Sequence, residues 1–284
     1  MAVFSTIAVG FDGSNGSQAA LRWAEVLSER THAPLAVLSA FTQPPAEMTV
    51  ALHDDLLDDY RRSLREHGVD QSLPVYIADG DPRQVLSTTA ATREYGLLVL
   101  GRAGRGSEPG FFHVGSVVEY VAHHTNTPLA VIPLDAVLND EPGPVVLGLD
   151  GSRESAGAAE LAAQVAEGLG VEVVAVHARL PHQGHDRVSA LARLDEAERQ
   201  RLDQWSEPLK DCGITTTAVS VVNTDPAAAV LDLAHEKKAS VVVIGTRGTG
   251  GFSGLRFGGQ AMRTLHRAAL PLILVPPRRS EPAA

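Results

Sequence analysis

The chain has 284 residues, 44% of them hydrophobic, and a formal net charge of −10; this length suffices for one large core or for two cores of ordinary size. The charges are scattered and form no basic face, which argues against a nucleic-acid partner, and no apolar run approaches the ~20 residues that span a membrane. Because the N-terminus is typical of a first strand rather than of a signal peptide and Cys212 is the only cysteine, we expect a cytoplasmic protein without a disulfide or a metal cluster.

Strands and helices are predicted to alternate along the chain, in the same order in each half. Continuous apolar runs such as 97–101 and 241–245 are typical of strands that helices bury on both faces. Asp-Pro pairs at 81–82 and 225–226 suit the N-cap and the first position of a helix. In the first half we predict strands at 7–10, 35–40, 73–78, 97–101 and 128–133, with helices at 16–30, about 50–67, from 82, and about 115–125. In the second half we predict strands at 145–149, 171–178, 215–222, 241–245 and 271–276, with helices at 155–169, about 186–211, from 226, and about 258–268.

Four sequence landmarks recur in the same order, which indicates a duplicated unit of about 140 residues. AVGFDGS at 8–14 matches VLGLDGS at 146–152, and GDPRQVLSTTA at 80–90 matches TDPAAAVLDLA at 224–234. LLVLGRAGRG at 97–106 matches VVVIGTRGTG at 241–250, and PLAVIP at 128–133 matches PLILVP at 271–276. The stretch at 133–145 is rich in proline, glycine and acidic residues, which suits a linker. We therefore predict one domain at 1–137 and another at 143–278.

The alternation of helices and buried strands predicts an α/β fold with a doubly wound, five-stranded parallel sheet in each domain, of the Rossmann-like type. Ligands bind such sheets at the carboxyl ends of the strands, near the point where the strand order reverses. The Asp-Gly-Ser turns and the Gly-rich loops all follow the carboxyl ends of predicted strands. We therefore expect a turn and a loop to face one crevice in each domain.

Several common catalytic and phosphate-binding motifs are absent. None of the three lysines follows a glycine, which excludes a Walker A loop, and Gly10, Gly13 and Gly16 have the wrong spacing for the dinucleotide fingerprint. There is no Gly-x-Ser-x-Gly elbow and no His-Glu-x-x-His motif. Ser14 stands where phosphate-accepting Asp-x-Asp sites have their second aspartate. These absences argue against the P-loop, hydrolase and metalloprotease classes.

The Gly-rich loop GRAGRGSEPGFFHVGS, residues 101–116, leaves two interpretations open. One is a phosphate cradle, because glycine lets the backbone approach anionic oxygens and a helix N-terminus offers unbonded N–H groups and the positive end of its dipole. The hydroxyl of Ser116 would add a donor. The other is a flexible connection that leads into a serine-capped helix.

Together these landmarks resemble the universal stress protein family in its tandem, two-domain form. The ATP-binding members carry Gly-x2-Gly-x9-Gly-Ser/Thr after the fourth strand, and Gly245, Gly248 and Gly258 have this spacing. The matching glycines at 101, 104 and 115 enclose one additional residue. The resemblance covers nearly the whole chain and implies a fold like that of the adenine nucleotide α-hydrolases.

The resemblance implies that each domain binds ATP, with or without Mg²⁺. The aspartate after the first strand and the end of the second strand would hold the adenosine part, and the Gly-rich loop with the following helix start would hold the ribose and phosphates. In the first domain the implied ATP-binding residues are Gly10, Phe11, Asp12, Ala40, Gly101, Arg102, Gly104, Gly115, Ser116 and Val117. In the second domain they are Gly148, Leu149, Asp150, Ala178, Gly245, Arg247, Gly248, Gly258, Gly259 and Gln260.

Two departures from the family pattern distinguish the domains. Gly259 stands where the family has serine or threonine, so one hydroxyl contact to a charged group, worth about 1.5–3 kcal/mol, is missing. The first domain keeps Ser116, but its loop is longer; this costs little closure entropy and leaves the placement of Gly115 open. We expect both domains to bind ATP. The alternative for Asp12 and Asp150 is that they are ordinary turn residues. The alternative for Arg102 and Arg247 is that they are solvated loop charges.

We expect a stress-response regulator or sensor that is not an enzyme, with no catalytic or metal-binding residue assigned. A glycine-rich cradle that lacks a general base, paired metal-binding carboxylates and an arginine–lysine clamp is poorly equipped for rapid phosphoryl transfer. One alternative is a universal stress protein that works as a protein-interaction module without nucleotide, and another is an enzyme of the adenine nucleotide α-hydrolase class. His177 is expected only to line the crevice. The resemblance also implies that the strands at 128–133 and 271–276 pair in an internal pseudo-dimer, and that chains form homodimers.

Overall fold

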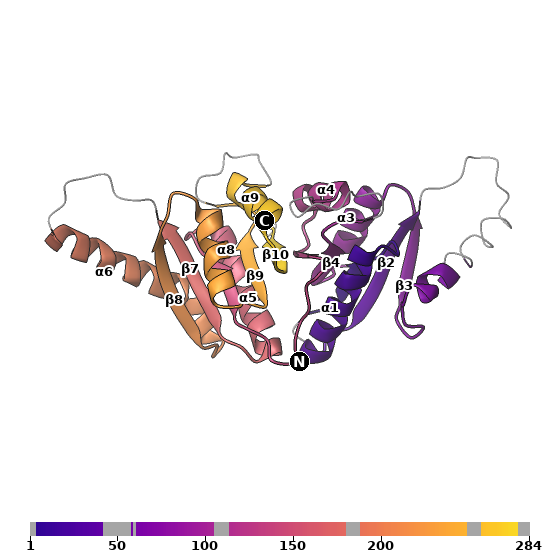
Figure 1. Cartoon of the computed structure of the whole chain (residues 1–284), viewed down its shortest axis with the longest axis horizontal. Coiled ribbons are helices and arrows are strands. Elements are labelled where there is room, and N and C mark those ends of the chain that lie inside the picture. Colours follow the sequence, from indigo (N-terminus) through magenta and orange to yellow (C-terminus); the bar gives the residue numbers. More distant parts are fainter. Residues whose placement is uncertain are drawn as a thin grey trace, which may run out of the picture. The chain divides into compact units, whose positions relative to one another are not determined.

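The chain divides between Leu138 and Asn139 into two compact units, each with its own parallel sheet. The structure, a computed structural model, describes residues 4–41, 58, 61–104, 114–179, 188–248 and 257–277. The first unit contains β1 (Ile7–Gly10), α1 (Asn15–Thr31), β2 (Leu35–Phe41), β3 (Val75–Asp79), α3 (Pro82–Thr92), β4 (Leu97–Gly101), α4 (Ser116–His124) and β5 (Leu129–Ile132) (Figure 1). The second unit contains β6 (Val145–Gly148), α5 (Arg153–Leu169), β7 (Val173–Arg179), α6 (Val188–Trp205), α7 (Glu207–Asp211), β8 (Thr216–Val222), α8 (Pro226–Glu236), β9 (Val241–Gly245), α9 (Gly259–Arg267) and β10 (Leu272–Val275).

Within the described residues, each unit has five parallel strands whose order reverses beside its first strand. The order is β3-β2-β1-β4-β5 in the first unit and β8-β7-β6-β9-β10 in the second. Ile7 of β1 is aligned with Leu35 of β2 on one side and with Leu97 of β4 on the other. Right-handed crossovers then put α1 and α3 on opposite faces of the sheet. The predicted doubly wound parallel fold is therefore confirmed.

The central strands are buried on both faces, as their continuous apolar sequences predict. Every residue of β1, β5 and β10 is buried, whereas β3 and β8 lie last in the order of their units and are partly exposed. Trp23 of α1 and Leu209 of α7 are among the largest fully buried side chains. The core of each unit therefore lies between its sheet and the covering helices. No helix within the described residues is both long and apolar enough to cross a bilayer.

Four helices begin with a side chain that caps the first turn. The Oγ atoms of Ser14 and Ser152 accept the amides three residues further on, at 3.2 and 3.1 Å, and so begin α1 and α5. The Oδ1 atoms of Asp81 and Asp225 accept the amides two residues further on, at 2.9 and 3.2 Å, and so begin α3 and α8. The predicted N-caps Asp81 and Asp225 are therefore confirmed.

The prediction of one long helix at about 186–211 is wrong at Ser206, where α6 ends and α7 begins. Pro208 lacks an amide hydrogen, and its ring would clash with the carbonyl four residues earlier, so a regular helix cannot continue through it. The amide of Ser206 still donates to the carbonyl of Leu202 at 2.9 Å, which completes the last turn of α6. The matching long helix that we predict for the first domain is described only at residues 58 and 61–66, which are helical.

Helix α1 approaches the end of β4 so closely that neither element has room for a side chain. A methyl group on Gly101 would overlap the carbonyl of Gly16 and would lie 2.9 Å from the amide nitrogen of Ser17. A methyl group on Gly16 would in turn overlap the carbonyl of Ala103. The turn after β1 and the loop after β4 therefore start side by side.

Replacing Gly101 by alanine is expected to lower the free energy of unfolding by about 1–3 kcal/mol, because the added methyl meets backbone that cannot turn aside. The matched control is Gly157→Ala in the interior of α5, where the nearest atom, Cγ1 of Val275, would be 4.0 Å away. That variant should gain up to about 1 kcal/mol in helix propensity. Urea titrations measure both changes, and an unchanged stability of Gly101→Ala would contradict the close packing.

The cap of α8 predicts a pH-dependent stability. Asp225→Ala should lose about 1 kcal/mol with the cap, whereas Asp225→Asn keeps the capping oxygen and loses only the ion pair with Arg267, worth about 0–1 kcal/mol at a surface. The hydrogen bond from Arg267, with those from the amides of Ala228 and Ala227, holds the pKa of Asp225 below its ordinary value. The stabilisation by the charge is therefore present above the unfolded pKa of about 3.9 and is lost as the pH falls through the lower folded pKa.

Urea titrations of wild type and Asp225→Asn at a series of acidic pH values measure this difference. The two free energies of unfolding should converge as the pH falls. Parallel curves would show that the carboxylate of Asp225 contributes no charge-dependent stability.

Candidate functional site

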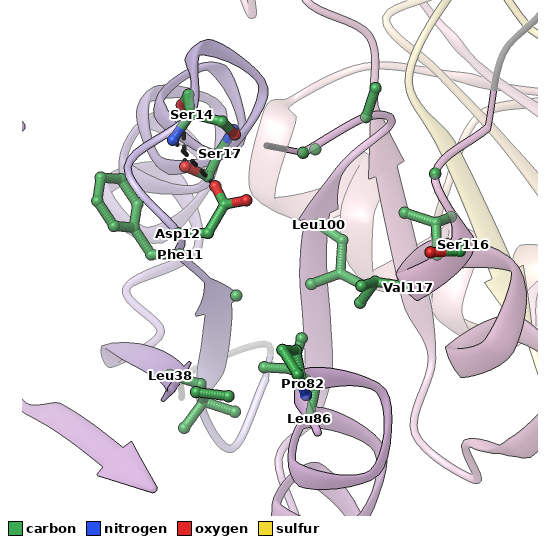
Figure 2. A pocket seen from close by; sticks show the side chains of 17 residues that line it. Phe11, Asp12, Ser14, Ser17, Leu38, Pro82, Leu86, Leu100, Ser116 and Val117 are labelled. Carbon is green, nitrogen blue, oxygen red and sulfur yellow. Dashed lines mark hydrogen bonds between the residues drawn. The ribbon is translucent and has the colours of Figure 1, made fainter. Parts of the chain in front are cut away.

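A cavity of about 400 Å³ lies at the carboxyl ends of β1 and β4, where the strand order of the first unit reverses. Figure 2 shows Asp12, from the turn after β1, and Ser116, from the start of α4, on opposite sides of this cavity with Leu100 between them. Leu38 and Leu86 contribute an apolar wall. The volume is in the ordinary range for small-molecule pockets.

The carboxylate of Asp12 is positioned by the turn that follows β1. Its Oδ1 accepts the amide of Ser14 at 2.9 Å, and Ser14 caps α1 (Figure 2). Its Oδ2 lies so near to Gly104 that a methyl group there would be 2.7 Å away. Any side chain at position 104 would displace the carboxylate. Glycine therefore lets the loop backbone meet this aspartate.

The Gly-rich loop returns to the strand end through one backbone hydrogen bond. The amide of Gly115 donates to the carbonyl of Arg102 at 2.9 Å, and the amide of Arg102 donates to Ile132 of β5 at 2.8 Å. Gly115 is the N-cap of α4, and no side chain of the described residues caps this helix. The first turn of α4 lines the cavity, so its backbone N–H groups and the positive end of its dipole favour an anion there.

The second unit repeats this arrangement around a cavity of about 470 Å³. Oδ1 of Asp150 accepts the amide of Ser152 at 3.0 Å, and a methyl group on Gly248 would overlap Oδ2. The amide of Gly258 donates to the carbonyl of Thr246 at 2.7 Å, and α9 has no side-chain cap in the part of the chain that the structure describes. Both Gly-rich loops thus close through equivalent bonds, and the additional residue of the first loop leaves the start of α4 in place.

The structure brings all but one of the predicted site residues to the two cavities. The exception is Arg102, whose side chain is buried and does not line the first cavity; burial lowers the pKa of its guanidinium. The first cavity is lined by the predicted residues Gly10, Phe11, Asp12, Ala40, Gly101, Gly104, Gly115, Ser116 and Val117. The second is lined by Gly148, Leu149, Asp150, Ala178, Gly245, Arg247, Gly248, Gly258, Gly259 and Gln260.

Our reasoning from the sequence missed the apolar walls, although the internal repeat contains the signal for them. The residues of the walls occupy equivalent positions in the two copies, and each of these positions is apolar in both. The pairs are Leu38 and Val176, Pro82 and Pro226, Leu86 and Val230, and Leu100 and Ile244. Apolar walls beside a carboxylate and a helix start are suited to a ligand with a flat apolar part and an anionic part.

His177 lines the second cavity, as expected, and its neighbours hold its ring. Its Nδ1 contacts Oε1 of Glu198, whose side chain is only 7% exposed, and Oγ of Ser220 donates to the same oxygen at 3.4 Å. The ring of Trp205 meets that of His177 edge-on with centroids 5.1 Å apart, and it also lies against Gly151. Glu198 and Trp205 come from α6, so only the tertiary fold brings them to this wall.

Thr246 and Arg263 are among the polar residues of the second cavity that were not predicted. Thr246 is 3% exposed, and its Oγ1 has no hydrogen-bond partner within the part of the chain that the structure describes. Buried hydroxyls normally have partners, which makes Thr246 a candidate contact for a ligand. Arg263 lines the same cavity, and its Nη2 lies 3.8 Å from the point that a Cβ would take on Gly259.

Comparison with known proteins matches the two units to one family. The model of the universal stress protein family matches residues 4–133 and 143–276. The universal stress protein MT2052 of Mycobacterium tuberculosis is 28% identical to this chain over 94% of both proteins. A universal stress protein of Archaeoglobus fulgidus has a similar structure, with a TM-score of 0.63 at 19% identity over 95% of this chain and 97% of its own.

Another solved structure shows a universal stress protein of Archaeoglobus fulgidus in complex with dAMP. It aligns with 48% of this chain and 98% of its own, at 24% identity and with a TM-score of 0.38. The family matches to this chain form two successive segments, and each segment contains one parallel sheet with one cavity at its strand ends. By these two matches, which together span most of its length, the chain belongs to the universal stress protein family.

Proposed function

We propose that the chain binds ATP in both cavities and acts as a cytoplasmic stress-response regulator rather than as an efficient enzyme. One observation carries this proposal. In each unit, a helix start without a capping side chain lies across a cavity from the aspartate that follows the first strand. The helix start suits phosphate, and the aspartate suits the hydroxyl groups of a ribose.

The adenosine part of ATP suits the side of the cavity that the strand ends form. Leu38 and Leu86 offer apolar contacts to a flat base in the first cavity, and Val176 and Val230 do so in the second. A carboxylate accepts hydrogen bonds only, so Asp12 would accept them from ribose hydroxyls, which donate.

The phosphates suit the start of α4 or α9. Backbone amides in the first helical turn donate to anionic oxygens, and the helix dipole favours their charge. In the first cavity Ser116 adds a hydroxyl at this place. Among the described residues, each cavity has a single lining aspartate, so a Mg²⁺ ion that accompanied the nucleotide would depend mainly on phosphate and water oxygens.

The wild-type chain is expected to bind one ATP in each cavity, and Gly115→Glu or Gly258→Glu should each abolish one of these sites. Both glycines have an extended backbone, with φ of −66° and −83°, that other residues also adopt. The added carboxylate would repel the phosphates. Calorimetric titration measures the stoichiometry, and denaturing the purified protein tests whether it releases adenine nucleotide.

Val137→Glu is the matched control, because it adds the same charge to a side chain that is 74% exposed and lines neither cavity. It should bind ATP like the wild type. Unchanged stoichiometry in both glycine variants would contradict the site assignment. A wild-type chain that binds no adenine nucleotide would favour the alternative of a protein-interaction module.

ATP hydrolysis by the purified chain is expected to stay below about 1 s⁻¹, the low end of ordinary turnover. Among the described residues, the first cavity offers no base beyond one turn-bound carboxylate, and neither cavity has the paired lining carboxylates that would hold a catalytic metal ion beside the phosphates. Phosphate release with and without Mg²⁺ measures the rate. Faster hydrolysis that Gly115→Glu and Gly258→Glu abolish would overturn this prediction and favour an enzyme of the adenine nucleotide α-hydrolase class.

A further inference from the structure

The two cavities differ in the charge of their lining side chains, and we propose that they divide adenine nucleotides by phosphate charge. The second cavity selects the triphosphate, whereas the first accepts a monophosphate as readily as a triphosphate. This inference rests on the proposed nucleotide binding and assigns a ligand class to each cavity.

The charge difference is plain in the residues that line each cavity. Among the described residues, the first cavity is lined by the carboxylate of Asp12 and by no arginine, lysine or histidine. The second is lined by the carboxylate of Asp150 together with Arg247, Arg263 and His177. An additional phosphate therefore meets no side-chain cation among the described residues of the first cavity, whereas it is attracted by side-chain cations in the second.

Substitutions at equivalent positions of the repeat produce this difference. Ala103 of the first loop and Arg247 of the second both stand between the first two glycines of their motif. Tyr120 and Arg263 are both the fifth residue of their helices, α4 and α9. Tyr120 stacks on His124 with ring centroids 4.0 Å apart and does not line the first cavity, whereas Arg263 lines the second.

Arg263 lies at the place where the second domain lacks a hydroxyl. Gly259 has no side chain, and the guanidinium of Arg263 lies beside it, at the start of α9. A guanidinium can donate two parallel hydrogen bonds to one phosphate, and such charge-assisted bonds are stronger than those of a neutral hydroxyl such as that of Ser116. The second helix start thus exchanges a neutral donor for a cationic one.

The loop after β9 adds a second, independent indication of a ligand. Thr246 is almost fully buried, lines the cavity, and has no hydrogen-bond partner for Oγ1 among the described residues. The equivalent residue of the first loop is Arg102, whose guanidinium is buried away from the cavity lining. The second loop therefore has a donor that the first lacks.

The loop segments outside the described residues do not reverse the difference in charge. By sequence, 105–113 contains Arg105, Glu108 and His113, so its formal charge is zero when the histidine is neutral. The segment 249–256 contains Arg256 and no acidic residue. The formal charges of these two segments therefore differ in the same direction as those of the described lining residues.

Single-cavity variants test the inference with ATP and AMP as probes in calorimetric titrations. Gly115→Glu, which retains the second cavity, should bind ATP on the order of tenfold to a hundredfold more tightly than AMP, with a preference that weakens at high salt. Gly258→Glu, which retains the first cavity, should bind ATP and AMP within about threefold of each other, because no cation there rewards the additional phosphates. Circular dichroism confirms that each variant is folded.

Arg263→Ala in the Gly115→Glu background should lower ATP affinity on the order of tenfold and leave AMP affinity within about threefold. Arg267→Ala is the matched control, because it removes the same charge from the same helix outside the cavity. It should keep the preference for ATP. The reciprocal change Ala103→Arg in the Gly258→Glu background should create such a preference in the first cavity.

Equal ATP-to-AMP ratios in the two cavities, or an unchanged ratio in Arg263→Ala, would overturn the inference and leave the proposed nucleotide binding intact. Inorganic tripolyphosphate tests whether the charge selection can hold when the proposed nucleotide binding fails. If neither cavity binds adenine nucleotide but the second binds tripolyphosphate through Arg263, the proposed function fails and the charge selection holds. If neither probe binds, both are overturned.

Discussion

The site in each unit depends on the backbone hydrogen bond that returns the Gly-rich loop to its strand. The amide of Gly115 meets the carbonyl of Arg102, and the amide of Gly258 meets that of Thr246. This bond sets a helix start beside the strand end, where the aspartate turn also lies. A glycine N-cap is less favourable than serine or aspartate by only a few tenths of a kcal/mol. In this chain α4 and α9 begin on glycine, whereas α1, α3, α5 and α8, whose starts also line the cavities, keep side-chain caps.

Backbone atoms and glycines define the part of each cavity between the aspartate turn and the helix start, so neighbouring side chains can change without loss of that part's shape. The two copies illustrate this independence. The contact of Asp12 with Gly104 recurs as the contact of Asp150 with Gly248, although the residues between and after these glycines differ in size and charge. The two copies thus keep the same backbone arrangement around the cavity, while the side chains that line it have diverged. This divergence is the basis of our proposal for the two cavities.

The fold could be predicted from the sequence for two reasons. Buried parallel strands have continuous apolar sequences, and the internal repeat gives two copies of the pattern to compare. It also predicted the caps Asp81 and Asp225, which are local. It could not predict what depends on tertiary placement. The burial of Arg102 and the contact of Glu198 with His177 need the packed sheet, and a loop arginine looks solvated until its surroundings are known. The break at Ser206 was predictable from Pro208, which a regular helix cannot include in its interior.

The two tryptophans of the chain lie in unlike surroundings, one in each unit. Trp23 is fully buried in α1, away from the residues that line the first cavity. Trp205 lies against Gly151, in the turn that follows Asp150, and touches the ring of His177 in the wall of the second cavity. The indole of Trp205 therefore forms a natural optical sensor of the second cavity, while that of Trp23 gives an internal reference signal, so the occupancy of one domain can be followed by intrinsic fluorescence without a label.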